Sequence, residues 1–72
     1  MTKTKIEIAK EMIEGNETEL ASLEIREMYL NRKVIMDDKP AYKYELGKLQ
    51  SDIKETKEWI KFLEEKVKEK FK

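Results

Sequence analysis

Three glutamates near the start of the chain have the spacing that a dinuclear metal site on a helix would use. Glu7, Glu11 and Glu14 lie four and three residues apart, so a helix places them on one face. Metal sites in helical bundles also use inward-facing histidines from Glu-x-x-His motifs, and this chain has no histidine. We therefore expect a solvated acidic face, with no metal and no cofactor.

The residue types that most enzymes use for acid–base and nucleophilic catalysis are missing. Histidine and cysteine are absent, and Ser22 and Ser51 have no recognisable activating partner in the sequence. No glycine-rich phosphate loop is present. A small bundle also lacks a concave substrate pocket unless an oligomer builds one between subunits. The sequence predicts a non-enzymatic protein without catalytic residues.

Apolar residues recur at alternating three- and four-residue steps in both halves of the chain, as in coiled coils. No stretch shows the period of two that strands require, so the pattern predicts an all-α fold in a single domain, residues 1–72. The first seam contains Ile6, Ala9, Ile13, Asn16, Leu20, Leu23, Glu27, Leu30 and Val34. The second contains Leu46, Leu49, Ile53, Thr56, Ile60, Leu63 and Val67.

Local signals place the ends of two helices. Thr4 and Glu7 have capping-box spacing, which predicts a first helix from about residue 5 to about residue 36. Lys39 precedes a proline and Pro40 suits a first helical turn, which predicts a turn at about 37–40 and a second helix from about 40 to 70. Two helices of matched length with a short turn predict an antiparallel hairpin.

The segment around Gly15 and Asn16 allows two interpretations. Gly15 could end one helix and Asn16 could begin another, which would give three helices. We favour one continuous or kinked helix, because the apolar register passes through Gly15 without slipping. Asn16 then either specifies the register or oligomeric state, or caps a broken helix.

A two-helix hairpin cannot cover all of its own apolar residues. Burial along a single seam does not outweigh the conformational entropy of about 70 ordered residues. We therefore expect a homo-oligomer, most simply a homodimeric four-helix bundle, and a surface that binds a larger protein. The residues expected in the self-association or partner interface are Ile25, Tyr29, Met36, Tyr44, Trp59 and Phe62.

The favoured function is an oligomeric regulator or adaptor that binds and modulates a larger protein. A weak nucleic-acid binder is an alternative, because a hairpin brings basic residues of both termini to one end. This alternative is not favoured, since 16 Lys plus Arg balance 16 Asp plus Glu. Its candidate contacts are Lys3, Lys5, Lys10, Lys66, Lys68 and Lys70.

A third class is an oligomeric ligand-sequestering or scaffolding protein with pockets between subunits. Its candidate residues are Arg26, Arg32 or Lys33 together with Tyr29. No run of 18 apolar residues is present, so we expect no membrane association. The absence of cysteine fits a reducing compartment, and we expect a cytoplasmic location.

Overall fold

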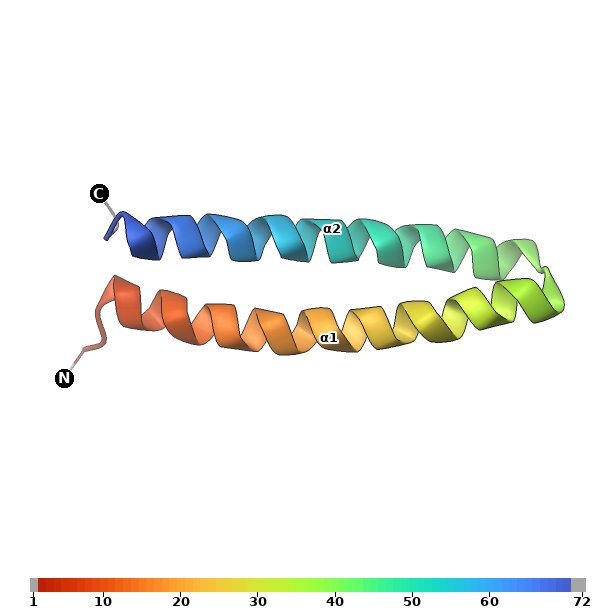
Figure 1. Cartoon of the computed structure of the whole chain (residues 1–72), viewed down its shortest axis with the longest axis horizontal. Helices are drawn as coiled ribbons and strands as arrows, with labels where there is room; N and C mark the ends of the chain where they lie inside the picture. The colour runs from red at the N-terminus through yellow and green to blue at the C-terminus, as the bar shows by residue number, and fades with distance from the viewer. Residues whose placement is uncertain (1, 71–72) are drawn as a thin grey trace.

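Two helices account for almost the whole chain. The computed structural model describes residues 2–70 and contains α1, Lys5–Asp37, and α2, Pro40–Lys68. The helices pack side by side in opposite directions, and both termini lie at the same end of the rod (Figure 1). The molecule measures 52 × 21 × 14 Å. The predicted all-α hairpin is confirmed, and its two ends are called here the turn end and the terminal end.

Both helices begin where local chemistry allows it. The Thr4 hydroxyl accepts a hydrogen bond from the backbone N–H of Glu7 at 3.2 Å, which satisfies one of the free N–H groups of the first turn of α1. Pro40 occupies the first turn of α2, where its missing N–H has no cost. Lys39 before it is extended, as the pre-proline position requires.

The helix ends differ slightly from the prediction. α1 ends at Asp37, and Asp38 adopts the left-handed conformation with φ of 46° while its N–H donates to the Val34 carbonyl at 3.0 Å. The turn therefore occupies two residues, Asp38 and Lys39, where four were expected. α2 ends at Lys68 and not near residue 70, because Lys70 has φ of 57°, which is incompatible with a right-handed helix.

Helix α1 is continuous through Gly15, so the three-helix interpretation is wrong. The Asn16 side chain donates from Nδ2 to the Met12 carbonyl of its own helix at 2.7 Å. Neither a C-cap at Gly15 nor an N-cap at Asn16 is formed, because the apolar seam continues on both sides and packs against α2.

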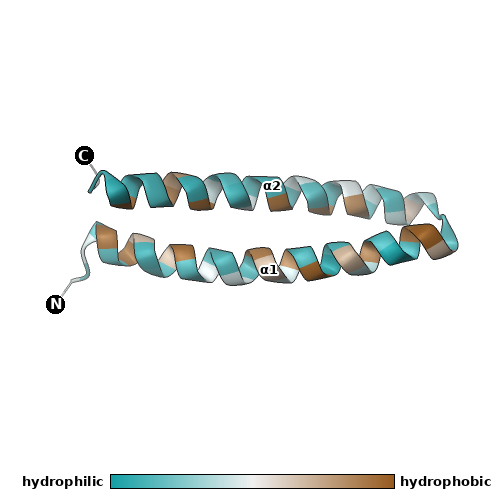
Figure 2. Cartoon of the chain, viewed as in Figure 1, coloured by the Kyte–Doolittle hydropathy of each residue, from teal (hydrophilic) through white to brown (hydrophobic). Residues whose placement is uncertain are grey.

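The predicted seams form the contact between the helices. Every seam position is buried or half-buried, which confirms both heptad registers. Hydrophobic segments of the two ribbons recur along both helices, and the end of α1 next to the turn is strongly hydrophobic (Figure 2). Among residues 2–70, the buried side chains are Ala9, Leu30, Leu49, Ile53, Ile60 and Leu63.

The core has a larger part at the turn end and a smaller part at the terminal end. Leu30, Leu49 and Ile53 form the turn-end cluster, and partly buried leucines and Tyr42 pack against it. Asn16 and Thr56 occupy the seam between the two parts, and both are half-buried. Neither helix, within the described residues, is long and apolar enough to cross a membrane.

Candidate interaction surfaces

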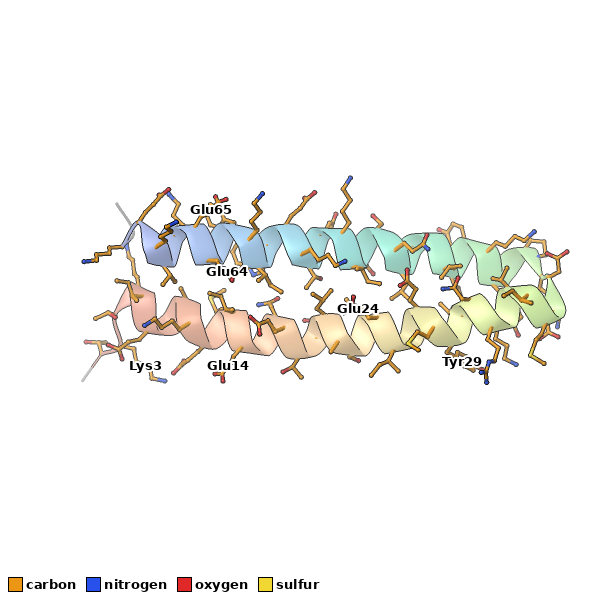
Figure 3. All side chains as sticks on the ribbon, viewed as in Figure 1. Lys3, Glu14, Glu24, Tyr29, Glu64 and Glu65 are labelled. Atoms are coloured by element: carbon orange, nitrogen blue, oxygen red, sulfur yellow. The ribbon has the colours of Figure 1, made fainter. Side chains whose placement is uncertain are left out.

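The first surface is an apolar stripe on the side of α1 that faces away from α2. Its members leave 57 to 83 % of their area exposed, and Tyr29 projects away from α2 in Figure 3. They occur at three- and four-residue steps, opposite the seam that contacts α2. We call this the outward stripe, and it consists of Ile25, Met28, Tyr29, Ile35 and Met36.

Charged residues surround the outward stripe. Arg32 lies in the middle of the same face by its spacing, Glu24 lies along one edge, and Arg26 and Lys33 lie along the other. The Lys33 ammonium is 5.8 Å from the centre of the Tyr29 ring, which is within the range of a cation–π contact. The stripe is therefore an apolar face with one acidic and one basic edge.

The second surface is a groove of about 240 Å³ between the two helices at the terminal end. Ala9, the smallest side chain of the α1 seam, and Leu63 of α2 lie together at its base, and both are buried. Four large apolar side chains on its walls are 38 to 45 % exposed. We call this the terminal groove, and its lining is Lys5, Ile8, Ala9, Met12, Trp59, Phe62 and Leu63.

The α2 wall of the terminal groove is aromatic. The Trp59 and Phe62 rings stack with centroids 5.7 Å apart and planes inclined by 13°. The Lys66 ammonium lies 5.7 Å from the Phe62 ring centre, so a positive charge borders the aromatic pair. With Lys5 on the opposite wall, the groove combines an apolar floor with two nearby ammonium groups.

The α1 wall of the groove was missed by the sequence prediction. Ile8 and Met12 lie outside the predicted seam in a lysine- and glutamate-rich segment, where isolated apolar residues are ordinary. The antiparallel register of the two helices could have identified these residues as part of a surface. When Ala9 is level with Leu63, Met12 is level with Ile60 and close to Trp59, so a large apolar residue on each helix faces the same edge.

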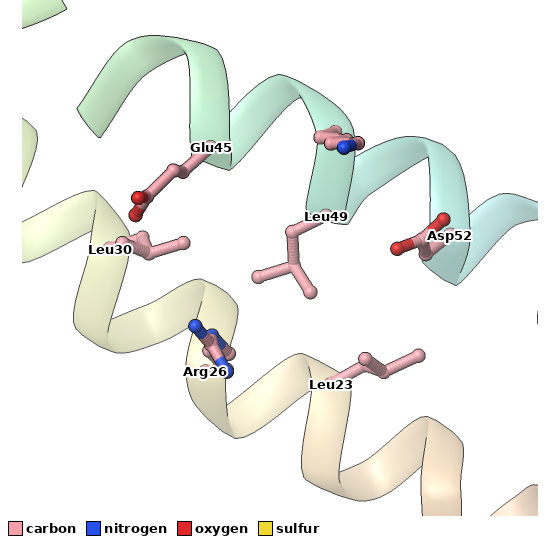
Figure 4. Close-up of a pocket in the computed structure, with 7 residues that line it drawn as sticks. Leu23, Arg26, Leu30, Glu45, Leu49 and Asp52 are labelled. Atoms are coloured by element: carbon pink, nitrogen blue, oxygen red, sulfur yellow. The ribbon is translucent and has the colours of Figure 1, made fainter. Parts of the chain in front are cut away.

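A third feature is a recess of about 290 Å³ on the turn half of the same edge (Figure 4). Leucines from both helices form its base, and Arg26, Glu45, Lys48 and Asp52 supply both signs of charge at its rim. The described side chains on this rim are exposed, so no buried polar group is aimed into the recess. Of the residues proposed for a ligand pocket, the recess contains Arg26 but neither Arg32 nor Lys33.

The lysines of the two termini meet at the terminal end, but acidic side chains accompany them. Lys3 pairs with Glu11, and Lys66 lies 3.8 Å from Glu69. Lys5 lines the terminal groove. The remaining candidates for nucleic-acid contact, Lys10, Lys68 and Lys70, are exposed.

The six residues predicted for one interface lie in three places. Ile25, Tyr29 and Met36 belong to the outward stripe, whereas Trp59 and Phe62 belong to the terminal groove. Tyr44 is 70 % exposed on the second turn of α2 and lies outside both surfaces.

The acidic residues near the N-terminus do not assemble into a metal site within residues 2–70, where no cluster of three or more metal-ligating side chains is found. Glu7 instead accepts a hydrogen bond from the Thr4 hydroxyl at 3.2 Å, and Glu14 points away from α2 in Figure 3. No protein-family profile, curated protein or solved structure matches this chain. Its class is therefore defined by geometry alone, as an antiparallel two-helix hairpin with two unpartnered apolar surfaces.

Proposed function

We propose that this chain is a non-enzymatic interaction protein, a self-associating helical hairpin that binds and modulates a larger protein. The observation that supports this proposal is the size of its exposed apolar surface. Among residues 2–70, ten large hydrophobic side chains stay exposed around a core of six buried ones. Nine of them gather on the outward stripe and the terminal groove, and contiguous exposed apolar surfaces of this kind on a small protein mark interaction sites.

The two surfaces suit different occupants. The outward stripe belongs to one helix and suits packing against another long helix. The terminal groove is short and lies between two helices, which is the geometry that receives an amphipathic helix through a few apolar anchors. In this proposal the chain forms a dimer of four helices, and the terminal groove binds the larger protein. A cytoplasmic location remains a prediction.

The partner segment that fits the groove carries one or two apolar anchors next to acidic residues. The Trp59–Phe62 pair and Met12 provide the apolar contact, while Lys5 on the groove wall favours a carboxylate beside it. Nucleic-acid binding and ligand sequestration are not supported by a comparable feature, since Lys3 and Lys66 have acidic neighbours and the recess rim carries both signs of charge.

The test uses capture followed by titration of the captured protein. Tagged wild type, Phe62→Glu and Tyr44→Ala are used to recover partners from a lysate of the source organism. We expect Phe62→Glu to lose a partner that Tyr44→Ala retains, because Phe62 lines the groove and Tyr44 does not. The purified partner should then shift the emission of Trp59, the only tryptophan of the chain.

Two results would contradict the groove as the binding site. One is equal recovery of the partner by wild type and Phe62→Glu. The other is a purified partner that binds without changing Trp59 emission, since a helix seated in the groove must change the polarity around that indole.

A further inference from the structure

The outward stripe has the spacing of a second helix-packing seam. Ile25, Met28 and Ile35, with Arg32 between them, follow steps of three, four and three residues on the face opposite α2. A helix that packs against only one neighbour needs one such seam. The second seam of α1 therefore requires a second helix, which the described chain does not supply.

The exposed area of the outward stripe indicates what kind of partner covers it. With about 200 Å² for a fully exposed large side chain, the five members together expose on the order of 700 Å². That exceeds the roughly 300–600 Å² of the largest apolar patch on a typical monomer and approaches the ~800 Å² that each partner contributes to a stable interface. The four large side chains of the terminal groove expose about half as much, which is too little for a stable dimer.

We propose that the outward stripe is the interface with a second copy of this chain, with α1 packed antiparallel on α1 and both α2 helices outside. This inference rests on the self-association in the proposed function and specifies its geometry. It differs from a conventional four-helix bundle, in which both helices of each hairpin face a common core. The edge shared by α1 and α2 is not suited to that role at the turn end, where Arg26, Glu45, Lys48 and Asp52 line it.

The position of Arg32 selects the antiparallel direction. In a two-fold parallel pair each residue faces itself, so Arg32 would meet its own copy at the centre of a desolvated interface. In an antiparallel pair the stripe overlays itself when Ile25 faces Met36 of the second copy. Arg32 then lies level with Tyr29 of the second copy, where a cation–π contact is available.

The charges along the edges of the stripe weakly disfavour the antiparallel arrangement. Antiparallel packing brings acidic edge to acidic edge and basic edge to basic edge, including Glu24 on one side and Lys33 on the other. These charges stay at the solvated rim, where water and salt screen them. A like-charge pair of arginines at the centre is not screened. The repulsion between the two Arg32 side chains therefore outweighs the repulsion at the rim and favours the antiparallel arrangement.

The absence of cysteine makes the geometry directly measurable by single-cysteine crosslinking. The probes are Ile25→Cys and Met36→Cys, made in chains of different tag size and treated with a short bis-maleimide. We expect a crosslink in the mixture of the two variants and little in either variant alone. Gln50→Cys, on an exposed position of α2, serves as the control that should not crosslink.

Sedimentation velocity measures the dimer itself. Met28 is 71 % exposed, so Met28→Glu should leave the helical circular dichroism of the hairpin intact. We expect this change to raise the dimer dissociation constant by about 100-fold, because it places a carboxylate in the centre of the apolar seam. The matched change Gln50→Glu should leave the dissociation constant unchanged.

The outcomes separate the stripe from self-association in general. A wild-type monomer at high micromolar concentration overturns both. A dimer that survives Met28→Glu and crosslinks through Ile8→Cys overturns the stripe and leaves self-association standing. Efficient crosslinking of Ile25→Cys to itself overturns the antiparallel arrangement.

Discussion

Asn16 shows how a polar residue can occupy a helix seam without a partner on the other helix. Its Nδ2 donates to the Met12 carbonyl, and the Thr56 hydroxyl donates to the Asp52 carbonyl at 2.8 Å. The register that pairs Ala9 with Leu63 places Asn16 level with Thr56. Each side chain is satisfied within its own helix, so neither of the two roles predicted for Asn16 is needed to explain it.

We predict that Asn16→Leu stabilises the protein by about 1–2 kcal/mol, because it adds apolar area to the seam and removes no bond between helices. Urea unfolding at fixed protein concentration measures the change. The control is Asn31→Leu, at an exposed position, where the effect should stay within about 0.5 kcal/mol. A loss of stability in Asn16→Leu would show that the amide selects the register after all.

At the scale of the elements, both glycines lie inside helices and have no structural reason to be glycine. A Cβ added at Gly15 or Gly47 meets no atom within 4 Å, and neither residue has a positive φ. Glycine inside a helix costs about 0.5–1 kcal/mol relative to alanine. We predict that Gly15→Ala and Gly47→Ala each raise the free energy of unfolding by about that amount, with additive effects in the double variant.

Thermal unfolding followed by circular dichroism measures the glycine effects. Gly15→Pro is the matched opposite change, because it removes a hydrogen bond of the continuous α1 helix, and it should destabilise by about 3 kcal/mol. Tolerance of this proline would mean that α1 is broken at residue 15 in solution.

The left-handed residue at the end of α1 gives a separate prediction. Asp38 has φ of 46°, a conformation that glycine adopts without strain, and its ion pair with Lys43 at 2.9 Å is exposed. We predict that Asp38→Gly raises stability by about 0.5–1 kcal/mol, whereas Asp38→Ala does not, since alanine keeps the Cβ strain. If urea unfolding shows equal effects of the two changes, the change in stability comes from the lost charge and not from the left-handed conformation.

The seams were predictable from the sequence, because a heptad pattern determines which face of each helix is buried. Leu30 and Leu49 were placed correctly on that basis alone. The grouping of exposed residues was not predictable. Tyr29 and Trp59 both lie off their seams. Whether two such residues belong to the same surface depends on how the two helices are placed against each other, which the heptad pattern does not give. The end of α2 was placed two residues late because no glycine or proline after Lys68 signals it.

At the scale of the whole molecule, the two ends of the rod differ in packing. The turn-end cluster combines Leu30, Leu49 and Ile53 with further leucines, whereas the terminal end buries Ala9, Ile60 and Leu63 and is opened on one side by the groove. We predict that amide hydrogen exchange is at least about tenfold slower in residues 46–53 than in residues 60–67. Mass spectrometry of peptides from each half measures this, and equal protection would indicate a single cooperative unit.

The distance between the outward stripe and the terminal groove determines how the proposed dimer could hold its targets. An antiparallel pair centred between Tyr29 and Arg32 places the two grooves at opposite poles, roughly 65 Å apart at 1.5 Å per residue. Both grooves could then be filled at once without mutual obstruction. Such a dimer is a bivalent spacer, and a target with two copies of the docking helix at that separation would be held by avidity far more tightly than one groove could hold it.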